Sequence, residues 1–156
     1  MNLRPIEPNS PAVLCALHVS AVHTAARWAL LAWVLLASFR MRGAEKPEAG
    51  VELSAEEKAV CELTNKERKN AGLEPLQLNA KLFEAARAHA ANMLKHGKMA
   101  HKLDGQEAPQ RVAAKGYRYA LVGENVAYGQ ETPEEVVAAW MASPTHRANI
   151  LRAQFT

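Results

Sequence analysis

The sequence predicts an α+β domain in which helices dominate, preceded by an N-terminal extension. Helix-start signals followed by apolar residues at helical spacing recur through residues 51–156, whereas only one apolar run there is short enough to favour a strand. The composition, 49% hydrophobic and 22% charged, is typical of a globular protein and argues against disorder. A length of 156 residues allows one domain, which we assign to residues 51–156, and an extension at residues 1–50.

The first helix is predicted from a capping box. Ser54-Ala-Glu-Glu57 places a hydroxyl and a carboxylate at the spacing that satisfies the first backbone N–H groups of a helix. The helix then runs to about Asn70, and Gly72 lies just past its end. Its inner stripe is expected to consist of Val60, Leu63 and Thr64, with Ala59 adjoining.

The second helix begins after Asn79, a good N-cap residue, and stops at Gly97. Apolar and small side chains recur on one of its faces, which we expect to pack against the core. His89 lies on this face and is therefore expected to be a core histidine with hydrogen-bond partners. The full face comprises Leu82, Ala85, Ala86, His89 and Met93.

Three shorter helices and a strand follow. A helix is expected at residues 109–115, and the run Leu121 to Ala127 is the clearest strand because it is apolar and short. Thr132-Pro133 supplies an N-cap and a proline at the first helical position, and Ser143-Pro144 repeats this arrangement for a short final helix. The buried side of the helix after Thr132 is expected to contain Val136, Val137, Trp140 and Met141.

Polar clusters interrupt the apolar segments of this last third. Gly123-Glu124-Asn125 lies within the predicted strand, where an unpaired carboxylate is expensive to bury and must be satisfied or used. Ser143-Pro-Thr-His146-Arg147 forms the second cluster, and His101 is the third polar position. A single strand cannot form a sheet, so the residues alone leave its partners open.

Several separated features, taken in order, carry a resemblance to a known family. Together they resemble a CAP domain, the superfamily of cysteine-rich secretory proteins, insect venom antigens and plant pathogenesis-related proteins, with the bacterial branch as the best match. The resemblance covers roughly residues 54 to 156. The features are Asn65-Lys-Glu-Arg68, Gly72-Leu73, Pro75-Leu76, Leu82 to Met93, His101, Gly116-Tyr117, Gly123-Glu124-Asn125, Trp140 and Ser143-Pro-Thr-His146-Arg147.

The resemblance implies an α/β/α sandwich whose sheet is completed by strands beyond the Asn149-Ile-Leu segment. This chain ends at Thr156, where those strands would begin. We therefore expect a domain that is incomplete at its C-terminus, either a truncated product or a fragment. The strand at residues 121–127 would then have unpaired edges, which are an aggregation hazard.

The resemblance also implies a cleft with two histidines and two glutamates that can hold a divalent metal. By position, His101 matches the first histidine and Glu124 the first glutamate. The second glutamate is expected three residues after Trp140, where this chain has Ser143, so that ligand is missing. His146 is expected to substitute, and His101, Glu124 and His146 would give two nitrogens and one oxygen, a set that suits zinc.

Other interpretations of these residues stay open. Glu124 can be a structural carboxylate, with His146 and Arg147 as hydrogen-bonding and ion-pairing partners. A peptidase-like hydrolase would use His101 and Glu124 as general acid and base. Ser143 shows no nucleophile-elbow pattern and is explained by N-capping. The leading hypothesis is a non-catalytic binding module for an unknown ligand or extracellular partner, with His101, Glu124, His146 and Ser143 as ligand-binding residues; a non-functional fragment is a further alternative.

The N-terminal extension predicts export. Trp28 to Phe39 is an apolar run of 12 residues, shorter than the roughly 20 that a membrane span needs, and it suits the central region of a signal peptide. Gly43-Ala44 offers a cleavage site, and residues 45–50 form a linker. Residues 1–26 are long and polar for the start of a signal peptide, which leaves either an uncleaved signal anchor or a misassigned start. We expect a secreted or extracytoplasmic protein that contacts a membrane only through this segment.

The charge distribution argues against a nucleic-acid-binding protein, and the cysteine count argues against a domain held by disulfides. Residues 51–156 hold 14 Lys and Arg against 13 Asp and Glu, so the domain is nearly neutral, and residues 1–50 hold 5 against 3. The cluster Lys66, Arg68 and Lys69 is interpreted as a solvated helix face, so no nucleic-acid partner is expected. Cys15 and Cys61 do not form a disulfide framework, and Cys61 is expected to be a small buried side chain.

Overall fold

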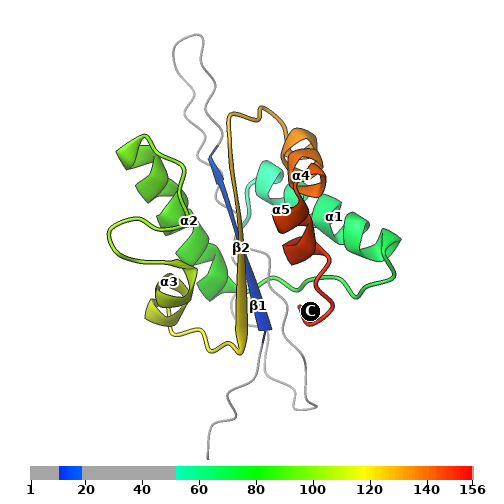
Figure 1. Cartoon of the computed structure of the whole chain (residues 1–156), viewed down its shortest axis with the longest axis horizontal. Coiled ribbons are helices and arrows are strands. Elements are labelled where there is room, and N and C mark those ends of the chain that lie inside the picture. Colours follow the sequence, from blue (N-terminus) through cyan, green and yellow to red (C-terminus); the bar gives the residue numbers. More distant parts are fainter. Residues whose placement is uncertain (1–10, 19–51, 156) are drawn as a thin grey trace, which may run out of the picture.

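The computed structural model describes residues 11–18 and 52–155, which form a three-layer α/β/α arrangement (Figure 1). Strands β1 and β2 lie in the middle, with α2 and α3 on one side and α1, α4 and α5 on the other. The expected fold class is confirmed. The elements are β1 (Pro11–His18), α1 (Ala55–Asn70), α2 (Ala80–His96), α3 (Ala108–Ala114), β2 (Leu121–Tyr128), α4 (Pro133–Ala142) and α5 (Pro144–Ile150).

The central sheet pairs two segments that lie about a hundred residues apart in the sequence. β1 runs parallel to β2, with a register from Pro11 opposite Leu121 to His18 opposite Tyr128. The expectation that both edges of the strand at residues 121–127 lack a partner was therefore wrong. The strand at residues 11–18 was not predicted, because this short apolar run lies in a segment interrupted by prolines and polar residues. The run opens with a proline, which a strand tolerates at its first position.

The predicted helix caps are confirmed where the signals were strongest. In α1, the Ser54 hydroxyl accepts a hydrogen bond from the Glu57 backbone N–H at 3.1 Å, and the Glu57 carboxylate accepts one from the Ser54 N–H at 2.9 Å. Asn79 caps α2 by accepting from the Lys81 N–H at 2.9 Å. Gly97 ends α2 with a φ of 57°, a left-handed conformation that glycine adopts without strain.

The core fills the spaces between the sheet and the two helical layers. Trp140 anchors it as expected, because its ring is buried and its indole Nε1–H donates to the Val126 carbonyl oxygen at 3.0 Å. Cys61 is buried, as predicted, whereas Met141 is only partly buried. The fully buried apolar side chains include Val60, Leu82, Phe83, Val112, Val136, Ile150 and Phe155.

The burial of Arg68 corrects one interpretation of the sequence. Its side chain is fully buried, so it does not belong to a solvated helix face. Instead it donates to four backbone carbonyl oxygens and tethers α1 to neighbouring loops. These acceptors are the carbonyls of Glu74 at 2.8 Å, Ile150 at 2.7 Å, Arg152 at 3.0 Å and Phe155.

The predicted signal segment at residues 28–39 lies outside the described residues, and its role stays a prediction. The division of the chain at residues 50 and 51 is likewise untested. Among the helices that the structure describes, none is long and apolar enough to cross a membrane.

Candidate functional site

The site is built around a buried carboxylate at the centre of β2. Glu124 is 8% exposed. Its Oε1 lies 2.8 Å from Nδ1 of His101, and its Oε2 accepts a hydrogen bond from Nη2 of Arg111. Both oxygens of Glu124 therefore accept hydrogen bonds, and these two donors compensate the negative charge that Glu124 carries within an apolar strand.

Arg111 holds the loop that carries His101 against the sheet. From α3 its guanidinium is only 8% exposed, and Nη1 donates to the carbonyl oxygens of His101 at 3.0 Å and Gln106 at 2.8 Å. The same side chain thus fixes the loop backbone and pairs with Glu124. Arg111 was not predicted as a site residue. Its local signal is a lone charge within the otherwise uncharged helix Ala108–Ala114.

His101 is the exposed member of the cluster, with 58% of its side chain accessible. The hydrogen bond to Glu124 raises the pKa of His101, and partial burial and the Arg111 charge oppose this rise. Because Nδ1 faces the carboxylate, Nδ1 carries a proton and Nε2 is the nitrogen left for another partner. Above the pKa Nε2 is an acceptor, and below it both nitrogens donate.

His146 lies close enough to His101 for the two imidazoles to influence each other. Burial lowers the pKa of His146, and the charge of His101 lowers it further. Two asparagines tie its helix to β2: Asn125 donates to the His146 carbonyl oxygen at 3.1 Å, and Asn149 donates to the Glu124 carbonyl oxygen at 3.2 Å. The structure therefore brings His101 and Glu124 into contact and places His146 within electrostatic range of His101.

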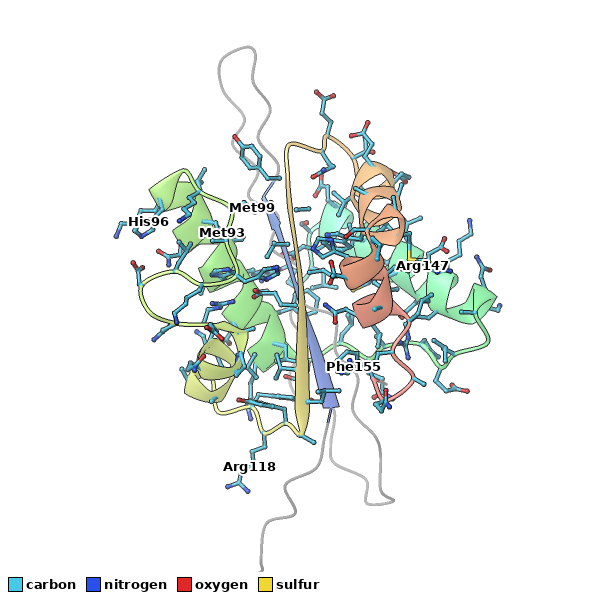
Figure 2. All side chains as sticks on the ribbon, in the orientation of Figure 1. Met93, His96, Met99, Arg118, Arg147 and Phe155 are labelled. Atoms are coloured by element: carbon cyan, nitrogen blue, oxygen red, sulfur yellow. The ribbon has the colours of Figure 1, made fainter. Side chains whose placement is uncertain are left out.

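Two expected partners of the cluster are placed elsewhere. The cation that pairs with Glu124 is Arg111, so the interpretation of Arg147 as its ion-pairing partner was wrong. Figure 2 shows Arg147 on the side of the sheet opposite α3. Ser143 occupies the N-cap position of α5, but its hydroxyl makes no capping hydrogen bond and lies 3.3 Å from Thr145 Oγ1. N-capping therefore does not explain Ser143.

The cluster does not fit a metal ion in this arrangement. Both oxygens of Glu124 accept hydrogen bonds, and the guanidinium of Arg111 against its Oε2 would repel a metal cation placed there. Within the part of the chain that the structure describes, no group of three or more His, Cys, Asp or Glu side chains is placed to hold a metal ion. Zinc binding by His101, Glu124 and His146 stays a prediction, and we derive no chemistry from it.

The three-layer sandwich and the contact between His101 and Glu124 are the features that the resemblance to a CAP domain predicted. The family model described as the cysteine-rich secretory protein family matches residues 61–156, and the chain belongs to that family. Uncharacterized protein YkwD of Bacillus subtilis (strain 168) is 46% identical over 105 residues, which is 67% of this chain. The match spans only 41% of the length of YkwD.

A solved structure supports the fold independently. An outer surface protein from Borrelia burgdorferi superposes with a TM-score of 0.54 over 66% of this chain and 77% of that protein. The two sequences are 18% identical over this match, so the likeness concerns the fold alone.

Proposed function

We propose that this chain is an exported CAP-domain module that binds an anionic group at His101 and does not turn it over. The observation that carries the proposal is the pairing of Glu124. Because Arg111 and His101 both donate to this carboxylate, the ligand-facing group of the cluster is an imidazole and not a free acid.

The charge balance of the cluster favours an anionic ligand. With His101 protonated, two cations, His101 and Arg111, face one carboxylate, Glu124, which leaves one net positive charge. The raised pKa of His101 extends this state toward neutral pH. The positive charge is concentrated on the exposed imidazole, where a carboxylate or phosphate group can accept a hydrogen bond from Nε2–H.

The same geometry speaks against Glu124 as the general base of a hydrolase. Its carboxylate is buried, and its oxygens accept hydrogen bonds from Arg111 and His101 rather than facing a substrate. The exposed Nε2 of His101 stays available as a base, and the activity panel below tests it. Ser143 contacts Thr145 and has no hydrogen bond to a described histidine, so an activated serine is unsupported.

Export rests on three agreeing features. The apolar run at residues 28–39 suits a signal peptide. The family model is described as secretory, and the structural neighbour in Borrelia burgdorferi is named as an outer surface protein. We extend this location to the present chain as part of the proposal.

Histidine NMR on the full chain tests the binding site. Titration with acetate and with inorganic phosphate should shift the ring resonances of His101 to saturation, and His101→Ala should abolish binding. His96 is the control, since it also faces a carboxylate, Asp104, at 3.3 Å, but this carboxylate is exposed, whereas Glu124 is buried against the guanidinium of Arg111. Equal shifts at both histidines would refute the site. Hydrolysis of any substrate in a peptide and ester panel, lost in Glu124→Gln, would refute the absence of turnover.

A further inference from the structure

Asn149, on α5, contacts the main chain of β2 at the residue whose carboxylate belongs to the anion site. Its Nδ2 donates to the carbonyl oxygen of Glu124 at 3.2 Å and to Oδ1 of Asn125 at 3.0 Å. Asn125 is fully buried, and its own Nδ2 donates to the carbonyl oxygen of His146 at 3.1 Å. These hydrogen bonds join α5 to two consecutive residues of β2.

The missing side chain at Gly123 allows this close approach. A Cβ atom at Gly123 would lie 3.3 Å from Oδ1 of Asn149 and 3.0 Å from Cζ of the buried Phe155 ring, closer than Cβ atoms ordinarily pack. A glycine inside a strand often marks a place where another part of the chain comes close. Here α5 and the residues after it lie directly against β2, next to Glu124.

Glu124 is held from both faces of β2. Successive side chains of a strand point to opposite faces, so the Glu124 side chain points away from the face that Gly123 presents to α5. Figure 1 shows this division, with α3 on one side of the sheet and α5 on the other. Arg111 and His101 contact the carboxylate, whereas Asn149 holds the main chain of the same residue from the α5 side.

The orientation of the His101 ring depends on where Glu124 lies. Among the described residues, this exposed ring has one hydrogen bond, the 2.8 Å contact of Nδ1 with Glu124 Oε1. A shift of the β2 main chain at Glu124 would move the carboxylate and release the ring. A site binds its ligand more tightly when the contacting group is held in place before the ligand arrives.

We propose that Asn149 is a positioning residue for the anion site: it fixes the main chain of Glu124 and thereby holds the carboxylate that orients His101. The inference rests on the anion site proposed above. Asn149 acts through Glu124 and makes no contact with the anion.

Phosphate titration of the full chain, followed by NMR of the histidine rings, tests the proposal. Asn149→Ala should weaken phosphate binding about fivefold, a change of about 1 kcal/mol, because His101 is no longer held. At a pH above the pKa of His101, it should also shift the ring proton from Nδ1 toward Nε2, which the nitrogen chemical shifts report. Asn65→Ala is the matched control, since Asn65 also makes two hydrogen bonds, at 3.0 and 2.8 Å to the main chain of Leu76, and it should leave both readouts unaltered.

Two results would overturn the proposal. The first is an Asn149→Ala variant that keeps the phosphate affinity and the His101 tautomer of the unaltered chain. The second is an equal loss in Asn149→Ala and Asn65→Ala, because that would reflect a general loss of stability. Failure of the anion site itself looks different: the unaltered chain would bind neither phosphate nor acetate, and the tautomer comparison would still decide whether Asn149 positions His101.

Discussion

Removing Arg111 should destabilise the domain more than any exposed ion pair can. Arg111→Met leaves Glu124 buried without its cation and frees the carbonyl oxygens of His101 and Gln106. Breaking a buried pair by removing one partner costs about 3–5 kcal/mol, because an uncompensated charge stays in the interior. Domains of this size are stable by only about 5–15 kcal/mol, so much of the native stability is at stake.

Urea unfolding, followed by circular dichroism, measures this loss. Lys115→Met is the matched control, because Lys115 follows the same helix and its 3.4 Å contact with Glu84 is solvent-exposed. Such exposed pairs contribute about 0–1 kcal/mol. Glu124→Leu combined with Arg111→Met removes both charges, and the double variant should lose less than the sum of the single losses.

A loss of stability in Arg111→Met no greater than that in Lys115→Met would refute a stabilising role for the buried Arg111–Glu124 pair. In that case Glu124 would have enough solvent or other donors to do without its cation. A strictly additive double variant would also contradict a direct coupling between the two side chains.

Three further predictions concern pH, capping and the buried tether. The pKa of His101 is raised in the folded state, so its contact with Glu124 stabilises the fold fully below the unfolded pKa near 6.5, and this stabilisation is lost as pH rises through the folded pKa. Urea unfolding across this pH window should show a loss of stability that His101→Ala lacks. Ser143→Ala should change stability by under about 0.5 kcal/mol, whereas Thr132→Ala, which removes a real cap, should cost about 1 kcal/mol; equal losses would contradict the observed geometry. Arg68→Met should cost about 3 kcal/mol or more, since four carbonyl acceptors lose their donor, and a loss below about 1 kcal/mol would refute the tether.

Local chemistry made the helices predictable. The caps at Ser54, Asn79 and Thr132 act within three residues of their own position, so the sequence contains all the information that they need. α3 was shifted by one residue from its expected bounds. Its start is fixed by Gln110, whose side chain accepts a hydrogen bond from the Glu107 N–H at 3.1 Å, a local signal that the prediction did not use.

Long-range contacts explain what sequence reasoning missed. The resemblance placed His101 and Glu124 in one cleft. The lone charge of Arg111 on α3 was a local hint, but it did not reveal the partner, because Glu124 lies 13 positions away on another element. The charged cluster around Arg68 looked solvated because spacing does not reveal which charges find acceptors 82 to 87 residues later. Burial of an arginine depends on carbonyl groups that no local pattern records.

The strand β1 brings the signal-peptide prediction into conflict with the fold. Cleavage near Gly43-Ala44 would remove residues 11–18, and β2 would lose the partner that the structure gives it. Each backbone hydrogen bond of such a pair contributes about 0.5–1.5 kcal/mol net, so an uncleaved chain should resist urea better than a chain of residues 45–156.

The comparison has two informative results. Lower stability of residues 45–156 would make β1 part of the working domain and favour an uncleaved anchor over a cleaved signal peptide. Equal stability, with a cooperative melt for both chains, would mean that the parallel pairing adds nothing, and the cleaved form would then be sufficient. In that second case the free edge of β2 would need another cover, since an unpaired edge invites association between copies, and the shorter chain should associate as its concentration rises.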